Sequence, residues 1–334
     1  VSFIFVSAFQ VYLFWQGIDL VRKFLNFAGP AVYVVMIILM IAIWAEVGGS
    51  LLSEVGNIFS SGTRSGGFEG LGSFGAFLAV FSIMVGYFAA VVINFGDFAR
   101  FVKNEEEMKK GNLYGLVGNV VFFSFITLMI TGGTIALFGE YVAQPTDMVA
   151  KVDNIFLTIV AAFAFFAATV GINMVANFIP PAYDLANLMP SKINFRTGGL
   201  ITAAFGFVIG GMWVAVITKM GIFPFVNTLG AILAPVFGIM ITDYYIIKKQ
   251  KIDVNALFNE GSGKYWYNDG FNLKGMVAWI LSGYIAIGSV WPNILPGDLG
   301  NFFANLGGGG GYAWIIGASL GAVVHLAISS AGKK

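Results

Sequence analysis

Four asparagines stand inside apolar stretches of the chain, where a polar side chain needs a partner. They are Asn94, Asn119, Asn173 and Asn177. An amide that meets only hydrocarbon costs free energy, so each should face another polar group or a water-filled cavity. For Asn119 we expect an ordinary hydrogen bond to a neighbouring helix, a contact worth about 0.6 kcal/mol on average.

Asn173 and Asn177 have the spacing of a ligand-binding pair. They lie one helical turn apart on the same face, and they precede Ile179-Pro180-Pro181, where the helix is expected to stop. A side-chain amide both donates and accepts hydrogen bonds. At a cavity wall the pair would suit a neutral ligand with a lactam or urea edge.

Residues 84–110 form an apolar segment that runs directly into charge. At about 100° per residue, Asn94 lies roughly 240° around a regular helix from Phe88. Both side chains can therefore face one cavity only if the helix is bent or broken between them, and Gly86 and Gly96 make a break tolerable. Discontinuous helices at mid-membrane are a device of inverted-repeat transporters.

Enzyme and metal chemistry find no support in the side chains. The chain has no cysteine, and His325 is its one histidine, so it lacks a thiolate nucleophile and the usual metal clusters. We expect His325 to be a packed or lipid-edge residue. Asp97 and Asp243 stand beside Arg100 and Lys248, where a helix cap or an ion pair explains them. We therefore expect no catalytic residues, no bound metal and no cofactor.

The elements that carry these residues are membrane helices. Hydrophobic residues make up 58% of the 334 residues and charged residues 10%, and the mean hydropathy is +0.84. That composition leaves too little polar surface for a water-soluble globule. Apolar runs of roughly 20 residues predict spanning helices rather than barrel strands. The predicted spans are 27–47, 76–101, 112–139, 153–178, 197–218, 222–247, 275–291 and 311–329, with residues 1–14 as the tail of another.

The basic residues predict the orientation of these spans. With the 15–26 loop in the cytoplasm, alternation places outside only Arg64, Lys151 and Lys219 of the 18 lysines and arginines. This asymmetry obeys the positive-inside rule and puts the C-terminus in the cytoplasm. No basic face is left free of lipid for nucleic acid, so that class of partner is set aside.

The loops are of two kinds. Residues 48–75 and 292–311 are rich in Gly and Ser and are expected to be flexible connectors. Residues 248–274 form a longer polar excursion whose Tyr265, Trp266 and Tyr267 suit the membrane interface.

Four segments resemble the nucleobase:cation symporter-1 family, and the similarity runs in the same order and spacing along the whole chain. They are WQGIDLVRKF (15–24), GYFAAVVINFGDFARF (86–101), GINMVANFIPPAYDLANLMP (171–190) and APVFGIMITDYYIIKKQKIDVNALF (234–258).

The resemblance implies an all-α membrane protein with a LeuT-like fold of two inverted five-helix repeats and two further helices. Residues 1–47 would be the end of the first repeat, residues 76–247 the second, and residues 275–329 the last two helices, all in one transmembrane domain. The first three helices would be missing, which agrees with a start at Val1 inside an apolar helix. About eight full spans and the tail of another are expected, and such a fragment should not transport by itself.

The resemblance also implies a substrate site. Phe88 occupies a position where the family often has a Trp that covers one face of the substrate ring, and the backbone around Tyr87 and Ala90 would offer hydrogen bonds at the helix break. Asn177 resembles the Asn that bonds the amide edge of the substrate. Residues Phe225 to Leu229, on a span bent by Pro224 and Pro235, resemble the apolar gate that folds over the ligand.

The cation site that the resemblance implies is degenerate. Sodium-dependent members have hydroxyls where this sequence has Gly171 and Ile172, and Ala168 stands at the position that lends a carbonyl. Loss of two oxygen ligands should weaken sodium binding, because hard cations need several oxygens. We therefore expect coupling to protons, with Asp97 as a candidate titrating group, or to sodium through a different site.

The expected function is symport of a neutral heterocycle, such as uracil, allantoin, hydantoin or cytosine, by alternating access through a monomer in the cell membrane. An amino-acid transporter of the LeuT-like superfamily is one alternative, although it would need a helix N-terminus or a cation for the substrate carboxylate. A membrane scaffold or embedded enzyme without transport activity is another, and it would have no ligand cavity.

Overall fold

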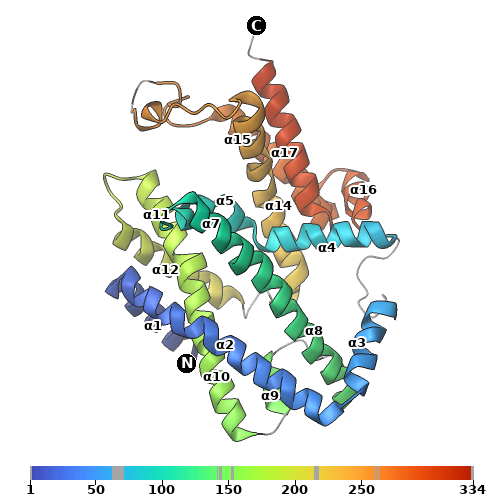
Figure 1. Cartoon of the computed structure of the whole chain (residues 1–334). Helices are drawn as coiled ribbons and strands as arrows, with labels where there is room; N and C mark the ends of the chain where they lie inside the picture. Colours follow the sequence, from blue (N-terminus) through green and yellow to red (C-terminus); the bar gives the residue numbers. More distant parts are fainter. Residues whose placement is uncertain are drawn as a thin grey trace. The chain divides into compact units, whose positions relative to one another are not determined.

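The computed structural model describes residues 2–61, 71–140, 142, 145–151, 154–213, 218–259, 261 and 263–331. These residues form helices and connecting loops, and the isolated antiparallel bridge Asn268–Phe271 is the only strand-like pairing among them (Figure 1). Arg64, which the orientation analysis placed outside, lies beyond the described residues.

Seven helical stretches among the described residues are long and apolar enough to cross a membrane, which confirms the all-α membrane class. They are Asp19–Val47, Glu105–Phe138, Thr158–Leu188, Phe195–Met212, Phe223–Ile247, Leu273–Val290 and Ala313–Ser330. Ser2–Gln16 and Ser73–Tyr87 are shorter apolar helices. The remaining predicted span, 76–101, is present as three short helices.

The chain forms two compact units, and each is described by itself. Unit 1 comprises Val1–Ser65 and Gly96–Gly210, and unit 2 comprises Gly66–Phe95 and Gly211–Lys334.

In unit 1 the helices follow the chain as α1 (Ser2–Gln16), α2 (Ile18–Val47), α3 (Ser50–Ser61), α6 (Phe95–Ala99), α7 (Glu105–Asn112), η1 (Leu113–Gly118), α8 (Asn119–Phe138), α9 (Pro145–Lys151), α10 (Ile155–Asn173), η2 (Met174–Phe178), α11 (Ile179–Leu188) and α12 (Phe195–Met212).

The helices of unit 2 are α4 (Ser73–Tyr87), α5 (Ala89–Ile93), α13 (Thr218–Met220), α14 (Ile222–Ile241), η4 (Thr242–Ile247), η5 (Asn255–Phe258), α15 (Leu273–Val290), η6 (Pro292–Ile294), α16 (Leu299–Leu306) and α17 (Ala313–Ser330). Helices α3 and α16 fall inside 48–75 and 292–311, so the expectation that these segments are only connectors was wrong.

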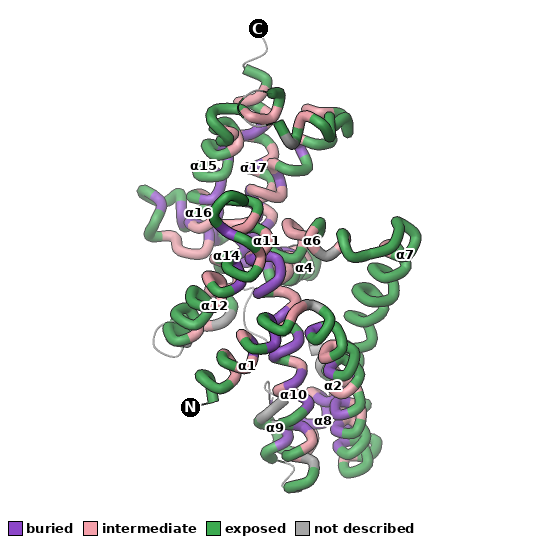
Figure 2. The backbone as a smooth tube through the Cα atoms, turned by 90° about the vertical axis from the view of Figure 1, so that its left-hand side faces the viewer, coloured by how far each residue is buried: buried purple, intermediate pink, exposed green. Residues whose placement is uncertain are grey.

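The core of unit 1 lies where α2, α3, α8 and α10 meet. Leu39, Ile43, Leu51 and Ile126 are buried there, and Figure 2 shows buried segments gathered along α2, α8 and α10. The helices can approach closely because Gly133 has no side chain, since a Cβ there would come within 2.2 Å of Ile43 Cγ2. Small residues at such crossings are the usual means of packing helices in membranes.

The span that carries Asn173 and Asn177 does not stop at the prolines, so that expectation was wrong. It continues from α10 through the π-helix η2 into α11, and Pro180 and Pro181 occupy the first turn of α11. The Ile179 N–H bonds to the Met174 carbonyl across the wider π turn. Proline costs little at the start of a helix, because its missing N–H would lack an intrahelical partner there.

Unit 2 is built around α14, which packs against α4, α15 and α17. The contact with α17 depends on glycines: a Cβ on Gly238 would lie 2.0 Å from the Ala318 carbonyl oxygen, and one on Gly321 would lie 2.5 Å from the Pro235 carbonyl oxygen. Backbone therefore meets backbone along this crossing, which we call the α14–α17 glycine contact.

The predicted break in the 76–101 segment is confirmed. Helix α4 ends at Tyr87, Phe88 stands between α4 and α5 with φ −92° and ψ 9°, and Asn94 separates α5 from α6. Just before the break, α4 approaches α14 through two glycines, where a Cβ on Gly230 would lie 3.2 Å from Gly86 Cα.

Candidate functional site

The asparagine pair in unit 1 is part of a chain of three amides. Asn177 Nδ2 donates to Asn173 Oδ1 at 2.5 Å, and Asn173 Nδ2 donates to Gln10 Oε1 at 2.9 Å. This confirms that the two asparagines share a helix face. Gln10 is 5% exposed whereas Asn177 is exposed, so the three linked amides run from the core of unit 1 to its surface. We call these three residues the amide chain.

The amide chain fixes which groups of Asn177 remain for a ligand. One of its two amide N–H groups goes to Asn173, which leaves its Oδ1 and its second N–H, a donor and acceptor pair on one rim. Asn177 lies in η2, and single-turn π segments are frequent at functional sites because they re-aim the side chains they carry. Gln10 was missed by sequence reasoning, although it is a polar residue within an apolar helix.

Asn119 makes the interhelical hydrogen bond expected of it. Its Oδ1 accepts a hydrogen bond from the Tyr33 hydroxyl, which joins α8 to α2 inside unit 1.

Phe88 stands at the helix break in unit 2. Its ring is half-buried and meets the ring of Tyr87 edge to face at 5.1 Å, and the Tyr87 side chain is 64% exposed. The Phe88 carbonyl accepts from the Val92 N–H at 3.0 Å, and the Ala90 carbonyl accepts from the Asn94 N–H at 2.9 Å. These two carbonyls therefore already accept backbone hydrogen bonds despite the break. Contacts of the backbone around Tyr87 and Ala90 with a ligand stay a prediction.

The two sides of the expected pocket fall in different compact units, since Phe88 belongs to unit 2 and Asn177 to unit 1. A shared pocket formed by these two residues stays a prediction.

The expected gate lies at the start of α14. Phe225 is half-buried and packs edge to face against Trp213 at 5.3 Å, while Leu229 is 44% exposed. Between them, Thr228 Oγ1 donates to the Pro224 carbonyl at 2.6 Å and accepts from Trp291 Nε1 at 2.8 Å. These bonds tie the start of α14 to the end of α15. Sequence reasoning missed Thr228 and Trp291, which are far apart in the chain.

The three positions of the expected cation site differ in their surroundings. Gly171 is buried against α2, where a Cβ would meet Leu25 Cδ2 at 2.9 Å. Ile172 is 66% exposed, and Ala168 is half-buried. Close packing against α2 thus gives Gly171 a structural reason to be glycine. The loss of the cation site at these positions stays a prediction.

Asp97 forms the expected ion pair, with 3.9 Å between its Oδ1 and Arg100 Nη2. The Arg100 guanidinium also lies 4.6 Å from the centre of the Tyr183 ring, a cation–π contact. The pairing agrees with the structural role expected for Asp97, and a part in proton coupling stays a prediction.

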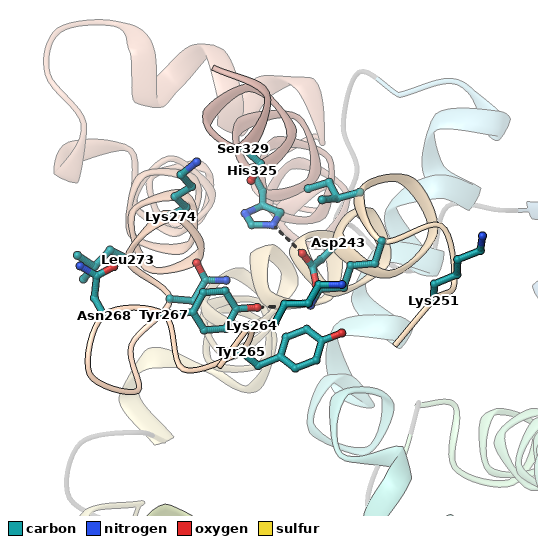
Figure 3. A pocket seen from close by; sticks show the side chains of 13 residues that line it. Asp243, Lys251, Lys264, Tyr265, Tyr267, Asn268, Leu273, Lys274, His325 and Ser329 are labelled. Carbon is teal, nitrogen blue, oxygen red and sulfur yellow. Dashed lines mark hydrogen bonds and ion pairs between the residues drawn. The ribbon is translucent and has the colours of Figure 1, made fainter. Parts of the chain in front are cut away.

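The second expected ion pair is also present, since Lys248 Nζ lies 2.5 Å from Asp243 Oδ2. Burial lowers the pKa of Lys248, but the hydrogen bond and charge of Asp243, with Tyr267, raise it above the usual lysine value. His325 is packed as expected, at 2% exposure, yet its Nε2 lies 3.6 Å from Asp243 Oδ1. Asp243 lies in η4, whereas His325 lies in α17 (Figure 3).

Comparisons with known proteins agree with these features. Residues 1–317 match the family model described as permeases for cytosine and purines, uracil, thiamine and allantoin. An allantoin permease of Bacillus subtilis is 31% identical over 295 residues, which cover 88% of this chain and 58% of that protein. A purine-uracil permease of Arabidopsis thaliana is 28% identical over 284 residues, 83% of this chain and 45% of the relative.

Among solved structures, the fold is similar to that of Mhp1, a nucleobase-cation-symport-1 family transporter in a closed conformation with bromovinylhydantoin bound. The TM-score is 0.68 at 21% identity, over 97% of this chain and 65% of that one. The inward-facing conformation of the same protein gives a TM-score of 0.61. These relatives confirm the LeuT-like fold, and this chain spans about half to two thirds of their length.

The relatives named here are permeases rather than enzymes. Seven apolar spans together with a family match over residues 1–317 make this a multi-pass membrane protein of the nucleobase:cation symporter-1 family, the permeases for cytosine and purines, uracil, thiamine and allantoin.

Proposed function

We propose that this protein is a secondary active transporter that imports a small neutral heterocycle, of the type of uracil, allantoin, hydantoin or cytosine, by alternating access. The observation that supports it most is the amide chain. It crosses an apolar unit from Gln10 to Asn177 and leaves an unbonded donor and acceptor at its exposed end. Such a rim matches the N–H and C=O groups along one edge of these rings.

Phe88 is the stacking residue of this proposal. The helix break places Phe88 at the junction of α4 and α5, where an aromatic face would cover one side of a flat ligand. Aromatic pairs contribute about 0.5–1.5 kcal/mol beyond the area that they bury. Phe225 and Leu229 close over the ligand from α14, and the bonds of Thr228 with Pro224 and Trp291 hold that end of the helix.

Uptake by the full-length protein in cells tests the proposal. Radiolabelled uracil, allantoin, hydantoin and cytosine are supplied singly, and accumulation is compared with cells that carry Asn177→Leu. We expect one or more of the four to accumulate, and the variant to lose up to about tenfold, because one lost amide contact is worth about 1.5 kcal/mol at the upper end of the usual range.

Asn119→Leu is the matched control, since it removes an amide from the same membrane region but outside the proposed site. With uptake normalised to the amount of protein in the membrane, it should retain transport. Uptake of an amino acid and none of the heterocycles would favour the amino-acid transporter, and no uptake of either would favour a scaffold.

The coupling ion is proposed to be the proton, with Asp97 as the titrating group, because the positions at Ala168, Gly171 and Ile172 supply no side-chain oxygen. Replacement of sodium by choline should leave uptake unchanged, whereas dissipation of the proton gradient should abolish it. Loss of uptake in choline would instead establish sodium coupling. The same proposal places the monomer in the cell membrane with its C-terminus in the cytoplasm.

A further inference from the structure

A pocket of about 630 Å³ lies in unit 2, between η4, the loop that follows it, the start of α15 and the end of α17. Its size falls in the usual range for small-ligand sites. Its charged lining consists of four lysines, one carboxylate and the single histidine of the chain: Lys248, Lys251, Lys264, Lys274, Asp243 and His325 (Figure 3). The pocket has no part in the proposed transport mechanism.

The charge of the pocket is unbalanced. Asp243 is paired with Lys248 at 2.5 Å, which accounts for the carboxylate. In the part of the chain that the structure describes, Lys251, Lys264 and Lys274 have no carboxylate partner, and Lys264 Nζ lies 5.7 Å from the centre of the Tyr265 ring. Three positive charges around one pocket favour an anion.

A buried histidine is the second sign that the pocket takes a ligand. His325 is 2% exposed and lines the pocket, and neither ring nitrogen has a hydrogen-bond partner among the described residues, because Asp243 Oδ1 lies 3.6 Å from Nε2, too far for a hydrogen bond. A neutral imidazole always carries one N–H, and burial of an unsatisfied polar group costs about 1–3 kcal/mol. An anion, or a water held by one, would supply the missing acceptor.

The apolar side of the pocket identifies the kind of anion. Leu273 lines the pocket, and Val277, Ile280 and Tyr284 follow it along one face of α15 at the spacing of helical neighbours. All four are 45% exposed or more. This apolar stripe begins at the rim of the pocket, so a ligand with a phosphate head could lay a hydrocarbon chain along it. Tyr265 and Tyr267, also in the lining, are residue types common at the lipid–water interface.

We propose that this pocket, which we call the lipid pocket, binds the phosphate of an anionic phospholipid. Lys251, Lys264 and Lys274 would surround the headgroup, and an acyl chain would lie on the apolar stripe of α15. Basic pockets between spanning helices are known devices for anionic headgroups, and a lysine near the membrane surface contributes about 1 kcal/mol. Figure 3 shows Lys251 and Lys274 on opposite sides of the pair formed by His325 and Asp243. Lysine stems are long and flexible, and the proposal requires both ammonium groups to turn toward one phosphate.

The test measures the melting temperature of the purified full-length protein in neutral detergent. Short-chain phosphatidylglycerol is titrated, with phosphatidylcholine of the same chain length and inorganic phosphate as separate arms. We expect phosphatidylglycerol to raise the melting temperature with saturation and the other two to leave it unchanged. In the double variant Lys251→Gln and Lys274→Gln, the half-saturating concentration should rise roughly thirty-fold, as about 1 kcal/mol per lysine predicts.

The matched control is the double variant Lys103→Gln and Lys192→Gln. It removes the same charge from two exposed lysines that are predicted to lie on the same side of the membrane but stand outside the pocket. It should keep the half-saturating concentration within about twofold, since these lysines do not line the pocket and exposed charges are screened by salt.

Equal affinity of the pocket variant and the unmodified protein for phosphatidylglycerol would overturn the site. Equal stabilisation by phosphatidylcholine would overturn recognition of the anion, and saturable stabilisation by inorganic phosphate alone would make this a site for a soluble anion instead of a lipid. A titration of the unmodified protein at low and high sodium chloride repeats the test without any substitution, because a charge-dominated site must weaken as salt rises.

Discussion

Among single residues, Asn173 should contribute more to the stability of the fold than Asn177, one helical turn away. It lies in the middle of the amide chain, where it accepts from Asn177 and donates to the buried Gln10. Removal of Asn177 takes away an exposed end, whereas removal of Asn173 leaves a buried acceptor without its partner. The two asparagines therefore separate binding from stability.

Asn173→Leu should cost about 1–3 kcal/mol of unfolding free energy, because Gln10 Oε1 stays buried and unbonded. Asn177→Leu should cost about 0.6 kcal/mol or less, the average for a hydrogen bond between membrane helices. Unfolding in a gradient of denaturing detergent measures both. Equal losses of unfolding free energy in the two variants would show that the middle position of Asn173 does not make it the larger contributor to stability.

The Lys248–Asp243 pair predicts how the stability of the protein depends on pH. The folded-state pKa of Lys248 is raised above the usual value of 10.5, so the contribution of the pair is fully present below that value and is lost as pH rises through the folded-state pKa. The difference in melting temperature between the unmodified protein and Lys248→Met should stay constant through neutral pH and shrink only at strongly alkaline pH. A difference that disappears near neutral pH would contradict this assignment.

At the scale of elements, the α14–α17 glycine contact is a crossing in unit 2 at which backbone meets backbone. Because backbone carbonyls stand where a Cβ would go, the neighbour cannot yield by turning a side chain. Gly238→Ala should therefore cost about 1–3 kcal/mol, the usual effect of overpacking. Thermal unfolding in detergent measures the loss.

Gly206→Ala is the control for that substitution. Gly206 also lies inside an apolar helix, α12, but a Cβ there meets nothing within 4 Å. It should be neutral or stabilise by up to about 1 kcal/mol, because alanine is the better helix former. If both alanine variants unfold at the same temperature, the glycine contact does not hold the two helices.

The positions of the elements were predictable where hydropathy alone decides them. The spans predicted at 275–291 and 311–329 are found as Leu273–Val290 and Ala313–Ser330. The break near Phe88 was also predictable, because two residues that needed one face could not share it on a regular helix.

The continuation of the span past Pro180 was not predictable, because a π turn has no compositional signature and the rule for proline gave the opposite answer. Nor could the sequence pair Asn173 with Gln10, since the two are 163 residues apart and periodicity reports only local neighbours. The same limit applies to the lining of the lipid pocket, which comes from η4, the loop that follows it, α15 and α17.

At the scale of the whole molecule, the absence of cysteine from residues 1–334 lets single introduced cysteines test the orientation of this chain. We expect Lys151→Cys and Lys219→Cys to react with a membrane-impermeant maleimide in intact cells, and Lys192→Cys and Lys264→Cys to react only after permeabilisation, as the positive-inside rule predicts. Labelling of Lys192→Cys in intact cells would invert the orientation and move the lipid pocket to the outer leaflet.

The single histidine of residues 1–334 is a spectroscopic reporter built into this chain. Since His325 is the only histidine in the sequence and lines the lipid pocket, selective nitrogen-15 labelling of histidine yields a magnetic resonance spectrum with a single ring. The position of that signal reports the tautomer and the hydrogen bonding of one defined place on α17. Arrival of a headgroup can thus be followed in the unaltered protein, without a dye, a fluorophore or a second label.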